Sequence, residues 1–172
     1  MLGAASTGKT SLSERYITGI FNPNIKLTVG VDFYVKTVNM KDKSVKLQIW
    51  DMGGEERFRF LLPTYALGSS GALFLIDVTR PDTLNEMNDW ISIVRSKNGK
   101  IPIIFVANKV DLKENRKVST QTLKEICEEN SFAEFYETSA KIGTNVEDVF
   151  RKLTELMLKQ VNSNQNNNSE KK

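Results

Sequence analysis

The chain has 172 residues, of which 40% are hydrophobic and 26% charged, so it is long enough to bury the core of one globular domain. Its net charge of +3 comes from 24 basic and 21 acidic residues interleaved along the chain, which argues against a nucleic-acid partner. The lack of histidine excludes His-based metal sites and Ser-His catalysis, and the single cysteine, Cys127, fits a cytoplasmic protein without disulfides.

The first motif is a glycine-rich segment that begins at Gly3 and reads Gly-Ala-Ala-Ser-Thr-Gly-Lys-Thr. It fits the phosphate-binding loop pattern of Gly, four residues and Gly-Lys-Ser/Thr, in which backbone N–H groups and a helix N-terminus surround a polyphosphate. Lys9 would place its ammonium against the β- and γ-phosphates, and the Thr10 hydroxyl would ligate Mg²⁺. The predicted phosphate contacts are Ala5, Ser6, Thr7, Gly8, Lys9, Thr10 and Ser11.

Only Met1 and Leu2 precede this loop, although a phosphate-binding loop follows a buried strand that normally lies in the middle of its sheet. We expect that this first strand is trimmed from the sequence rather than lost from the fold, because every later element is intact.

The rest of the chain alternates between apolar runs and amphipathic segments, which predicts a doubly wound, mostly parallel α/β sheet with one antiparallel hairpin. The expected helices cover residues 9–20, 81–97 and 120–129, with a last helix from 146, and the expected strands cover 31–40, 45–50, 72–78, 101–107 and 134–138. Residues 1–161 are predicted to form the domain, and the Asn/Ser/Lys-rich residues 162–172 a disordered tail.

Short polar segments follow three of the predicted strands, at the sheet edge where such folds bind ligands. Asp51 ends an apolar strand and can hold Mg²⁺, and Gly54 can offer its N–H to a γ-phosphate because no side chain blocks the approach. On its own this segment is more typical of an ordinary strand-end turn than of a nucleotide site.

The second group of strand-end residues predicts guanine recognition. The Asp111 carboxylate can accept both the N1–H and the amino group of guanine, a donor pair that adenine lacks. Asn108 can bridge loops and contact the base, while the Lys109 stem covers one ring face. After the last strand come Ser139, Ala140 and Lys141, where the Ala140 N–H can bond the guanine carbonyl oxygen.

Together these motifs resemble the Ras-like small GTPases, and most closely their Rab-type branch, over residues 3–159. The residues that carry the resemblance are Thr28–Phe33, Trp50-Asp51, Glu56-Arg57-Phe58, Asn108–Asp111 and Glu137–Lys141. The resemblance implies a P-loop NTPase fold that binds GTP or GDP with Mg²⁺ and acts as a monomeric switch. It also implies an effector, an activating protein and an exchange factor as partners.

The resemblance assigns further roles by position. Thr28 would ligate Mg²⁺, and Phe21 would pack against the guanine. Switch I would span residues 21–30 and switch II residues 54–66, and both would be ordered by GTP and released by hydrolysis. Lys9, Gly54 and Glu55 are the predicted catalytic residues.

Several residues depart from the family pattern. Glu55 stands where the family has a water-orienting glutamine, and an ionised carboxylate only accepts hydrogen bonds, although it can also take a proton from water. Met52-Gly53-Gly54 looks more like the Arf and Gα branches. Switch I contains no arginine, so slow intrinsic hydrolysis and an arginine supplied by a partner are expected. The tail has no cysteine, so no covalent membrane anchor is expected.

Two functions therefore remain open, and Glu55 separates them. The first is a GTP-hydrolysing molecular switch. The second is an interaction module of the same fold that holds GTP or GDP without hydrolysing it. An ATP-dependent P-loop enzyme is disfavoured by Asp111.

Overall fold

The computed structural model describes residues 1–41 and 43–169. Three parallel strands form the centre of the molecule in the order β3 (Ala72–Asp77), β4 (Ile103–Asn108) and β5 (Glu134–Glu137). Their apolar sequences fit complete burial, since every residue of β3 and β4 is buried. Two further strands, β1 (Val31–Met40) and β2 (Lys43–Met52), form an antiparallel hairpin. The predicted α/β architecture is confirmed.

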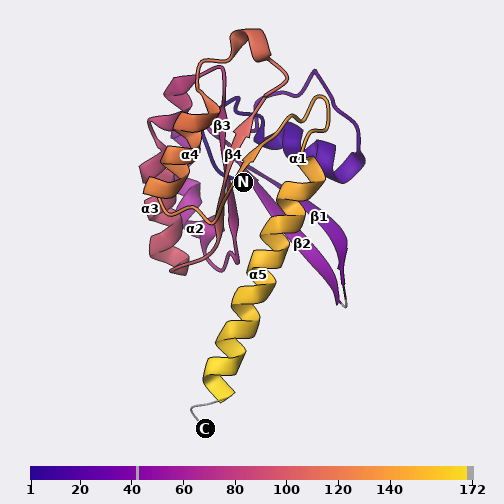
Figure 1. Ribbon diagram of the computed structural model, residues 1–172, viewed down its shortest axis with the longest axis vertical. Coiled ribbons are helices and arrows are strands. Elements are labelled where there is room, and N and C mark those ends of the chain that lie inside the picture. The colour runs from indigo at the N-terminus through magenta and orange to yellow at the C-terminus, as the bar shows by residue number, and fades with distance from the viewer. Residues whose placement is uncertain (42, 170–172) are drawn as a thin grey trace.

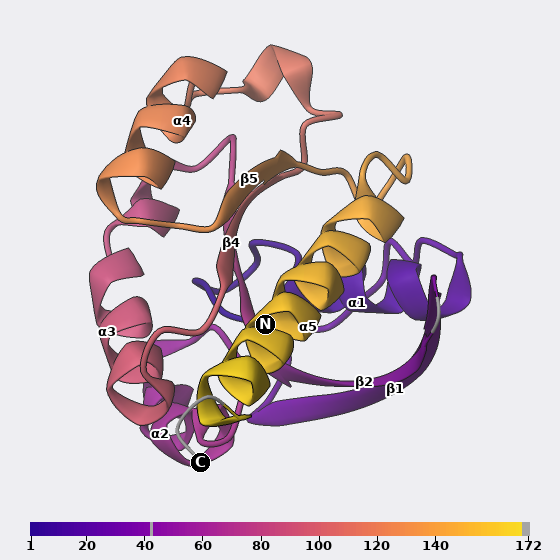
Figure 2. The same cartoon turned by 60° about the horizontal axis from the view of Figure 1, so that its bottom comes forward.

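Helices cover both faces of this sheet, as Figures 1 and 2 show. On one face lie α2 (Leu62–Ala66), α3 (Met87–Asn98) and α4 (Thr120–Glu129), whose apolar side chains pack on Phe74 and Phe105. On the other face lie α1 (Lys9–Thr18) and α5 (Val146–Ser169), which pack on Leu73 and Leu75. Tyr16 of α1 stacks on Phe150 of α5, with 3.9 Å between ring centroids. Two cores therefore hold the domain, one on each side of the sheet.

Met1 and Leu2 lie between the two groups of strands. Leu2 donates its N–H to the Leu73 carbonyl (2.8 Å) and accepts from the Leu75 N–H (2.9 Å), as in a parallel ladder. On the opposite side, the Met1 nitrogen donates to the Trp50 carbonyl (2.7 Å), and the Met52 N–H donates to the Met1 carbonyl (3.3 Å). These two residues occupy the place where the sequence led us to expect a complete central strand.

Some element bounds differ from those predicted. The first helix ends at Thr18 because Gly19 turns the chain with a φ of 75°. The helix expected over residues 81–97 is divided into a short 3₁₀ turn, Pro81–Leu84, and α3. Residues 56–66, expected to be a switch loop, contain a 3₁₀ turn (Glu56–Leu61) and α2. A third 3₁₀ turn spans Lys113–Asn115.

The last helix differs most from its predicted extent. Helix α5 extends to Ser169, which takes it into the residues assigned to a disordered tail. Residues 170–172 of the predicted tail lie outside the described part of the chain. The division of the chain at residue 161 stays a prediction. No helix in the described part of the chain is long and apolar enough to cross a membrane.

Candidate functional site

The phosphate-binding loop lies between Leu2 and the start of α1. Its backbone turns through left-handed conformations at Gly3 (φ 127°), Ser6 (φ 63°) and Gly8 (φ 92°). A Cβ on Gly8 would lie 2.3 Å from the Asn108 amide nitrogen, and one on Gly3 only 2.2 Å from the Leu75 carbonyl oxygen. Glycine is therefore required at both positions for packing as well as for conformation.

Lys9, the first residue of α1, turns its ammonium back into the loop. The Nζ donates to the carbonyl oxygens of Gly3 (2.8 Å) and Ala4 (2.9 Å), and the side chain is buried. Burial lowers the pKa of Lys9 from 10.5 to about 8, although the nearby Asp51 carboxylate opposes this shift. The loop thus holds a desolvated cation that an anionic phosphate group would stabilise.

The three residues predicted to ligate a cation meet beside this lysine. The Thr10 hydroxyl donates to an Asp51 carboxylate oxygen (2.5 Å), and the Thr10 and Thr28 hydroxyl oxygens lie 2.6 Å apart. The other carboxylate oxygen of Asp51 is buried and has no hydrogen-bond partner among the described residues, and burial raises the Asp51 pKa. Two hydroxyls around an unpartnered buried carboxylate oxygen are a donor set that fits Mg²⁺, which prefers oxygen ligands.

Gly54 and Glu55 close the phosphate end of the site. Gly54 lies so close to the loop that a Cβ would be 2.5 Å from the Ala5 nitrogen. Any other residue would push the two segments apart. The Glu55 carboxylate accepts a hydrogen bond from Arg57 (2.9 Å) in a partly exposed ion pair.

At the other end, the residues predicted to contact a base are joined by hydrogen bonds. The Asn108 amide donates to the Thr7 carbonyl (2.9 Å) and accepts from the Thr138 hydroxyl (3.0 Å), so it ties the phosphate-binding loop to the end of β5. The Ser139 hydroxyl donates to one oxygen of Asp111 (2.5 Å). Because Asp111 has a second oxygen, its carboxylate can still accept from a ligand.

A pocket of about 320 Å³ connects these two ends. Lys26 and Leu27 of the predicted switch I and Leu112, which the sequence did not single out, also line it. Of the predicted site residues, Thr7, Asp51 and Ser139 do not line the pocket and are buried beneath it. The others all line it: Ala5, Ser6, Gly8, Lys9, Thr10, Ser11, Phe21, Thr28, Gly54, Glu55, Asn108, Lys109, Asp111, Ala140 and Lys141.

Two polar residues at this site were missed by the sequence analysis. Asp77 is buried and forms an ion pair with Lys109 (2.7 Å), whose backbone has a φ of 68°. Arg80 donates to the carbonyl oxygen of Ala5 in the phosphate-binding loop (3.1 Å). Asp77 ends a buried strand as Asp51 does, so its position was a usable signal. No sequence signal identified Arg80, because none of its neighbours in the sequence indicates a contact with the phosphate-binding loop.

Comparison with known proteins now identifies the family. The Ras family profile matches residues 1–159. The Ras-related protein Rab-2B of Dictyostelium discoideum is 39% identical over 165 residues, which are 95% of this chain and 81% of that protein. Rab-4 of the same organism is also 39% identical, over 97% of this chain and 82% of its own length. Rab-32B is 38% identical over 95% of this chain and 65% of its own length. The chain belongs to the Ras family and is a Rab-type small GTPase with a P-loop NTPase fold.

Proposed function

We propose that the protein is a molecular switch that binds GTP or GDP with Mg²⁺ and slowly hydrolyses GTP to GDP and phosphate. The proposal rests above all on the convergence of Thr10, Thr28 and Asp51 around one unpartnered carboxylate oxygen, beside the buried Lys9. The same pocket reaches Asp111, which supports guanine as the base.

The main residues of the site have defined parts in this proposal. Thr10, Thr28 and Asp51 would hold Mg²⁺, which when bound neutralises charge on the phosphates. Lys9 holds its ammonium against the β- and γ-phosphates, and the Gly54 N–H donates to the γ-phosphate. Phe21 and Lys109 enclose the base, while Asp111 and the Ala140 N–H bind its edge. Contact of Thr28 and Gly54 with the γ-phosphate would order residues 21–30 and 54–66 for effector binding.

Slow intrinsic hydrolysis follows from the residues around the γ-phosphate. Switch I supplies Lys26 but no arginine, and lysine lacks the planar fork of donors that stabilises a transferring phosphoryl group. An arginine finger contributes about 10³- to 10⁵-fold in this fold class. We therefore propose an activating protein that supplies one, together with an exchange factor and an effector, and a monomeric, cytoplasmic switch.

The experiment that tests this function follows the fate of bound GTP. The purified protein is loaded with GTP and Mg²⁺, freed of excess nucleotide and sampled over hours by chromatography of the bound nucleotide. We expect conversion to GDP with a rate constant on the order of 10⁻⁴ per second, typical of the fold without an arginine finger. Persistent GTP would contradict hydrolysis, and no retained nucleotide would contradict the whole proposal.

A second candidate function, nucleotide binding without hydrolysis, is favoured by the ion pair between Glu55 and Arg57. In this pair the Glu55 carboxylate accepts a hydrogen bond from Arg57, and a carboxylate has no hydrogen to donate to the γ-phosphate.

Replacing Glu55 tests which candidate applies. We expect Glu55→Gln to raise the rate of GTP hydrolysis about tenfold, because an amide can both accept from the water and donate to the phosphate. Glu56→Gln makes the same charge change at the exposed neighbouring position and serves as the control. Equal rates in the two variants and the parent protein would remove Glu55 from the mechanism.

A further inference from the structure

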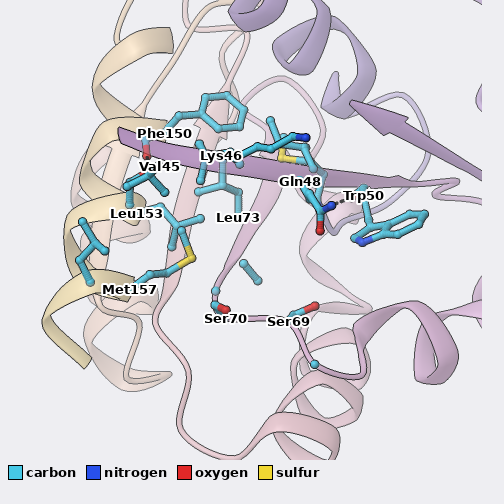
Figure 3. A pocket seen from close by; sticks show the side chains of 18 of the residues that line it. Val45, Lys46, Gln48, Trp50, Ser69, Ser70, Leu73, Phe150, Leu153 and Met157 are labelled. Carbon is cyan, nitrogen blue, oxygen red and sulfur yellow. Dashed lines mark hydrogen bonds between the residues drawn. The ribbon is translucent and has the colours of Figure 1, made fainter. Parts of the chain in front are cut away.

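Strand β3 has different surroundings at its two ends. Near its start, Leu73 borders a cavity of about 360 Å³, whose other walls come mainly from β2 and α5 (Figure 3). This cavity continues the line of Met1 and Leu2, the place of the predicted first strand, and we assign no ligand to it. At the other end, Asp77 pairs with Lys109 of the nucleotide pocket. This buried acid has no part yet in the function proposed above.

Asp77 is held in place by its own turn before it meets the lysine. It is the last residue of β3 and lies beside Asn108 of β4, the residue that precedes Lys109. One oxygen of its carboxylate accepts hydrogen bonds from the backbone N–H (2.9 Å) and the hydroxyl (2.7 Å) of Thr79. The other oxygen lies 2.7 Å from the Lys109 ammonium. Each carboxylate oxygen therefore has its own partner.

The turn after β3 is a rigid support for this carboxylate. The Thr83 hydroxyl accepts from the Asp77 N–H (3.2 Å) and donates to the Arg80 carbonyl (2.7 Å). The Val78 N–H donates to the Asn108 carbonyl (3.2 Å), which joins the turn to the end of β4. These bonds fix the backbone on both sides of the Asp77 side chain.

Burial decides which member of the pair positions the other. The Asp77 side chain is 2% exposed, whereas that of Lys109 is 32% exposed. A buried carboxylate is costly unless it is paired and hydrogen-bonded, so Asp77 favours one fixed place for the ammonium. A lysine stem, in contrast, has many rotamers in solvent. The pair thus restricts the conformation of Lys109 far more than that of Asp77.

The place of the ammonium determines where the Lys109 stem lies. The backbone of Lys109 is in the left-handed region, with a φ of 68°, and its ammonium is fixed at Asp77. Between these two points the stem borders the nucleotide pocket, and its Cε lies 3.9 Å from the position that a Cβ on Gly8 would take. This is the stem that covers one ring face of the base in the proposed function.

We propose that Asp77 is a positioning residue for the base, which holds the Lys109 ammonium so that the lysine stem covers the guanine ring. This inference rests on the proposed function and adds a residue to it. Contact with a ring face does not distinguish the groups on the base edge, which are bound by Asp111. Asp77 therefore prolongs nucleotide binding without changing the choice of base.

The first test is Asp77→Asn. The asparagine oxygen can still accept from Thr79 and keep the turn, but a neutral amide no longer holds an ammonium. We expect radiolabelled GDP, chased with unlabelled GDP, to dissociate about tenfold faster than from the parent chain. Glu134→Gln is the control, because it removes an ion pair of similar length (Lys152, 2.8 Å) outside the pocket and should leave the rate unchanged. A parental rate for Asp77→Asn would overturn the proposal.

A double variant shows whether Asp77 acts through Lys109. Lys109→Met keeps an apolar stem and removes the ammonium, so it should also accelerate GDP dissociation about tenfold. If Asp77 acts only through the ammonium, Asp77→Asn has no further effect in the Lys109→Met background. The double variant should then release GDP about tenfold faster than the parent. A rate about 100-fold faster would mean independent effects and a merely structural role for Asp77.

The choice of base provides a second readout that a general loosening of the site would change. Inosine diphosphate has the same ring system as GDP but lacks the exocyclic amino group that Asp111 would bind. We expect Asp77→Asn to raise the Kd of both nucleotides by the same factor, about tenfold, and to keep the parental ratio between them. A smaller preference for GDP would show that Asp77 acts on the base edge, and would overturn the proposal.

The ion pair can also be followed in the parent chain by NMR of ¹⁵N-labelled lysine ammonium groups. We expect a Lys109 signal because pairing slows proton exchange with water, and its loss in Lys109→Met assigns it. The signal should persist when GDP binds. Its disappearance on GDP binding would show that the ammonium leaves Asp77, and would overturn the proposal even if Asp77→Asn does not fold.

Failure of this inference is distinct from failure of the proposed function. If the parent chain retains no GDP, the proposed function fails and the role of Asp77 fails with it. If the parent retains GDP and Asp77→Asn releases it equally slowly, only the role of Asp77 fails.

Discussion

Lys9 links nucleotide binding to pH through its buried ammonium. Its pKa of about 8 in the free protein is low because burial disfavours the charged form. A bound polyphosphate favours the ammonium, so binding takes up protons once the pH exceeds about 8. We expect the affinity for GDP to be constant near pH 7 and to fall by up to about tenfold per pH unit above 8.

Calorimetry in two buffers with different ionisation enthalpies measures this proton uptake directly. The free protein should show the opposite trend in stability. Because the folded-state pKa of Lys9 is depressed, its contribution disfavours folding below about 8 and this penalty is removed as the pH rises towards 10.5. A GDP affinity that stays flat from neutral pH to pH 10 would show that Lys9 does not contact the phosphates.

Asp111 provides a second single-residue test, which concerns the recognition of guanine. Asp111→Asn replaces one acceptor oxygen with a donor, which would face the donors of guanine and repel them. We expect the affinity for GDP to fall by at least about 100-fold, the effect of leaving buried donors unpaired. Glu129→Gln, an equivalent change at an exposed helix end, should leave the affinity unchanged. Retention of full GDP affinity by Asp111→Asn would make the guanine assignment wrong.

Which residues approach the pocket was largely predictable, but their hydrogen-bond partners were not. Lys9, Asn108 and Asp111 follow from local motifs because strand ends place them at one edge of the sheet. The pairing of Lys109 with Asp77 depends on two strands whose order in the sheet the sequence does not give. Likewise, Arg80 reaches Ala5 only because the loop after β3 folds back over the phosphate-binding loop.

Among the elements, the segment from residue 56 to residue 66 contacts α3 through apolar packing, through a hydrogen bond from Asn98 to the Ala66 carbonyl (2.6 Å) and through Arg59. Arg59 pairs with Glu86 (2.6 Å) and Asp89 (3.6 Å), and its guanidinium lies 5.9 Å from the ring centre of buried Trp90. The arginine is one-fifth exposed, so solvent screens its pairs only in part. In a switch protein, this contact would set how readily the segment changes conformation.

We expect Arg59→Ala to accelerate hydrogen exchange across residues 55–66 by about three- to tenfold, while the free energy of unfolding changes by only about 1 kcal/mol. Arg57→Ala is the control, because Arg57 is two-thirds exposed and its partner Glu55 is a near neighbour in sequence rather than a residue of α3. If both variants exchange alike, the contact with α3 does not hold the segment.

Element bounds were predictable where apolar periodicity decides them and wrong where local polar contacts compete. Strands β3 and β4 lie within two residues of their predicted ends because burial fixes them. The helix expected from residue 81 is interrupted because the Thr83 hydroxyl bonds backbone groups of Asp77 and Arg80. Such side-chain bonds stabilise a turn in place of a continuing helix. The pattern of hydrophobic residues along the sequence does not predict such hydrogen bonds.

At the scale of the whole molecule, Leu2 connects the β1–β2 hairpin, the central sheet and the phosphate-binding loop. Its side chain is buried with Met52 of β2 and Phe74 of β3, and its backbone bonds to β3. The next residue, Gly3, begins the phosphate-binding loop and packs against the Leu75 carbonyl. Loss of packing at Leu2 should therefore loosen the hairpin and the loop together, whereas loss of packing elsewhere in the same core should not.

We expect Leu2→Ala and Leu123→Ala each to lower the free energy of unfolding by about 2–5 kcal/mol, because both side chains are almost fully buried. Leu123 lies in α4, remote from the loop, so only Leu2→Ala should also weaken GDP binding, by about tenfold, and accelerate hydrogen exchange in β2. Denaturant unfolding and nucleotide titration of both variants separate the two effects. Equal nucleotide affinity in the two variants would show that the loop keeps its geometry independently of Leu2, and that the hairpin and the nucleotide site are not coupled through this residue.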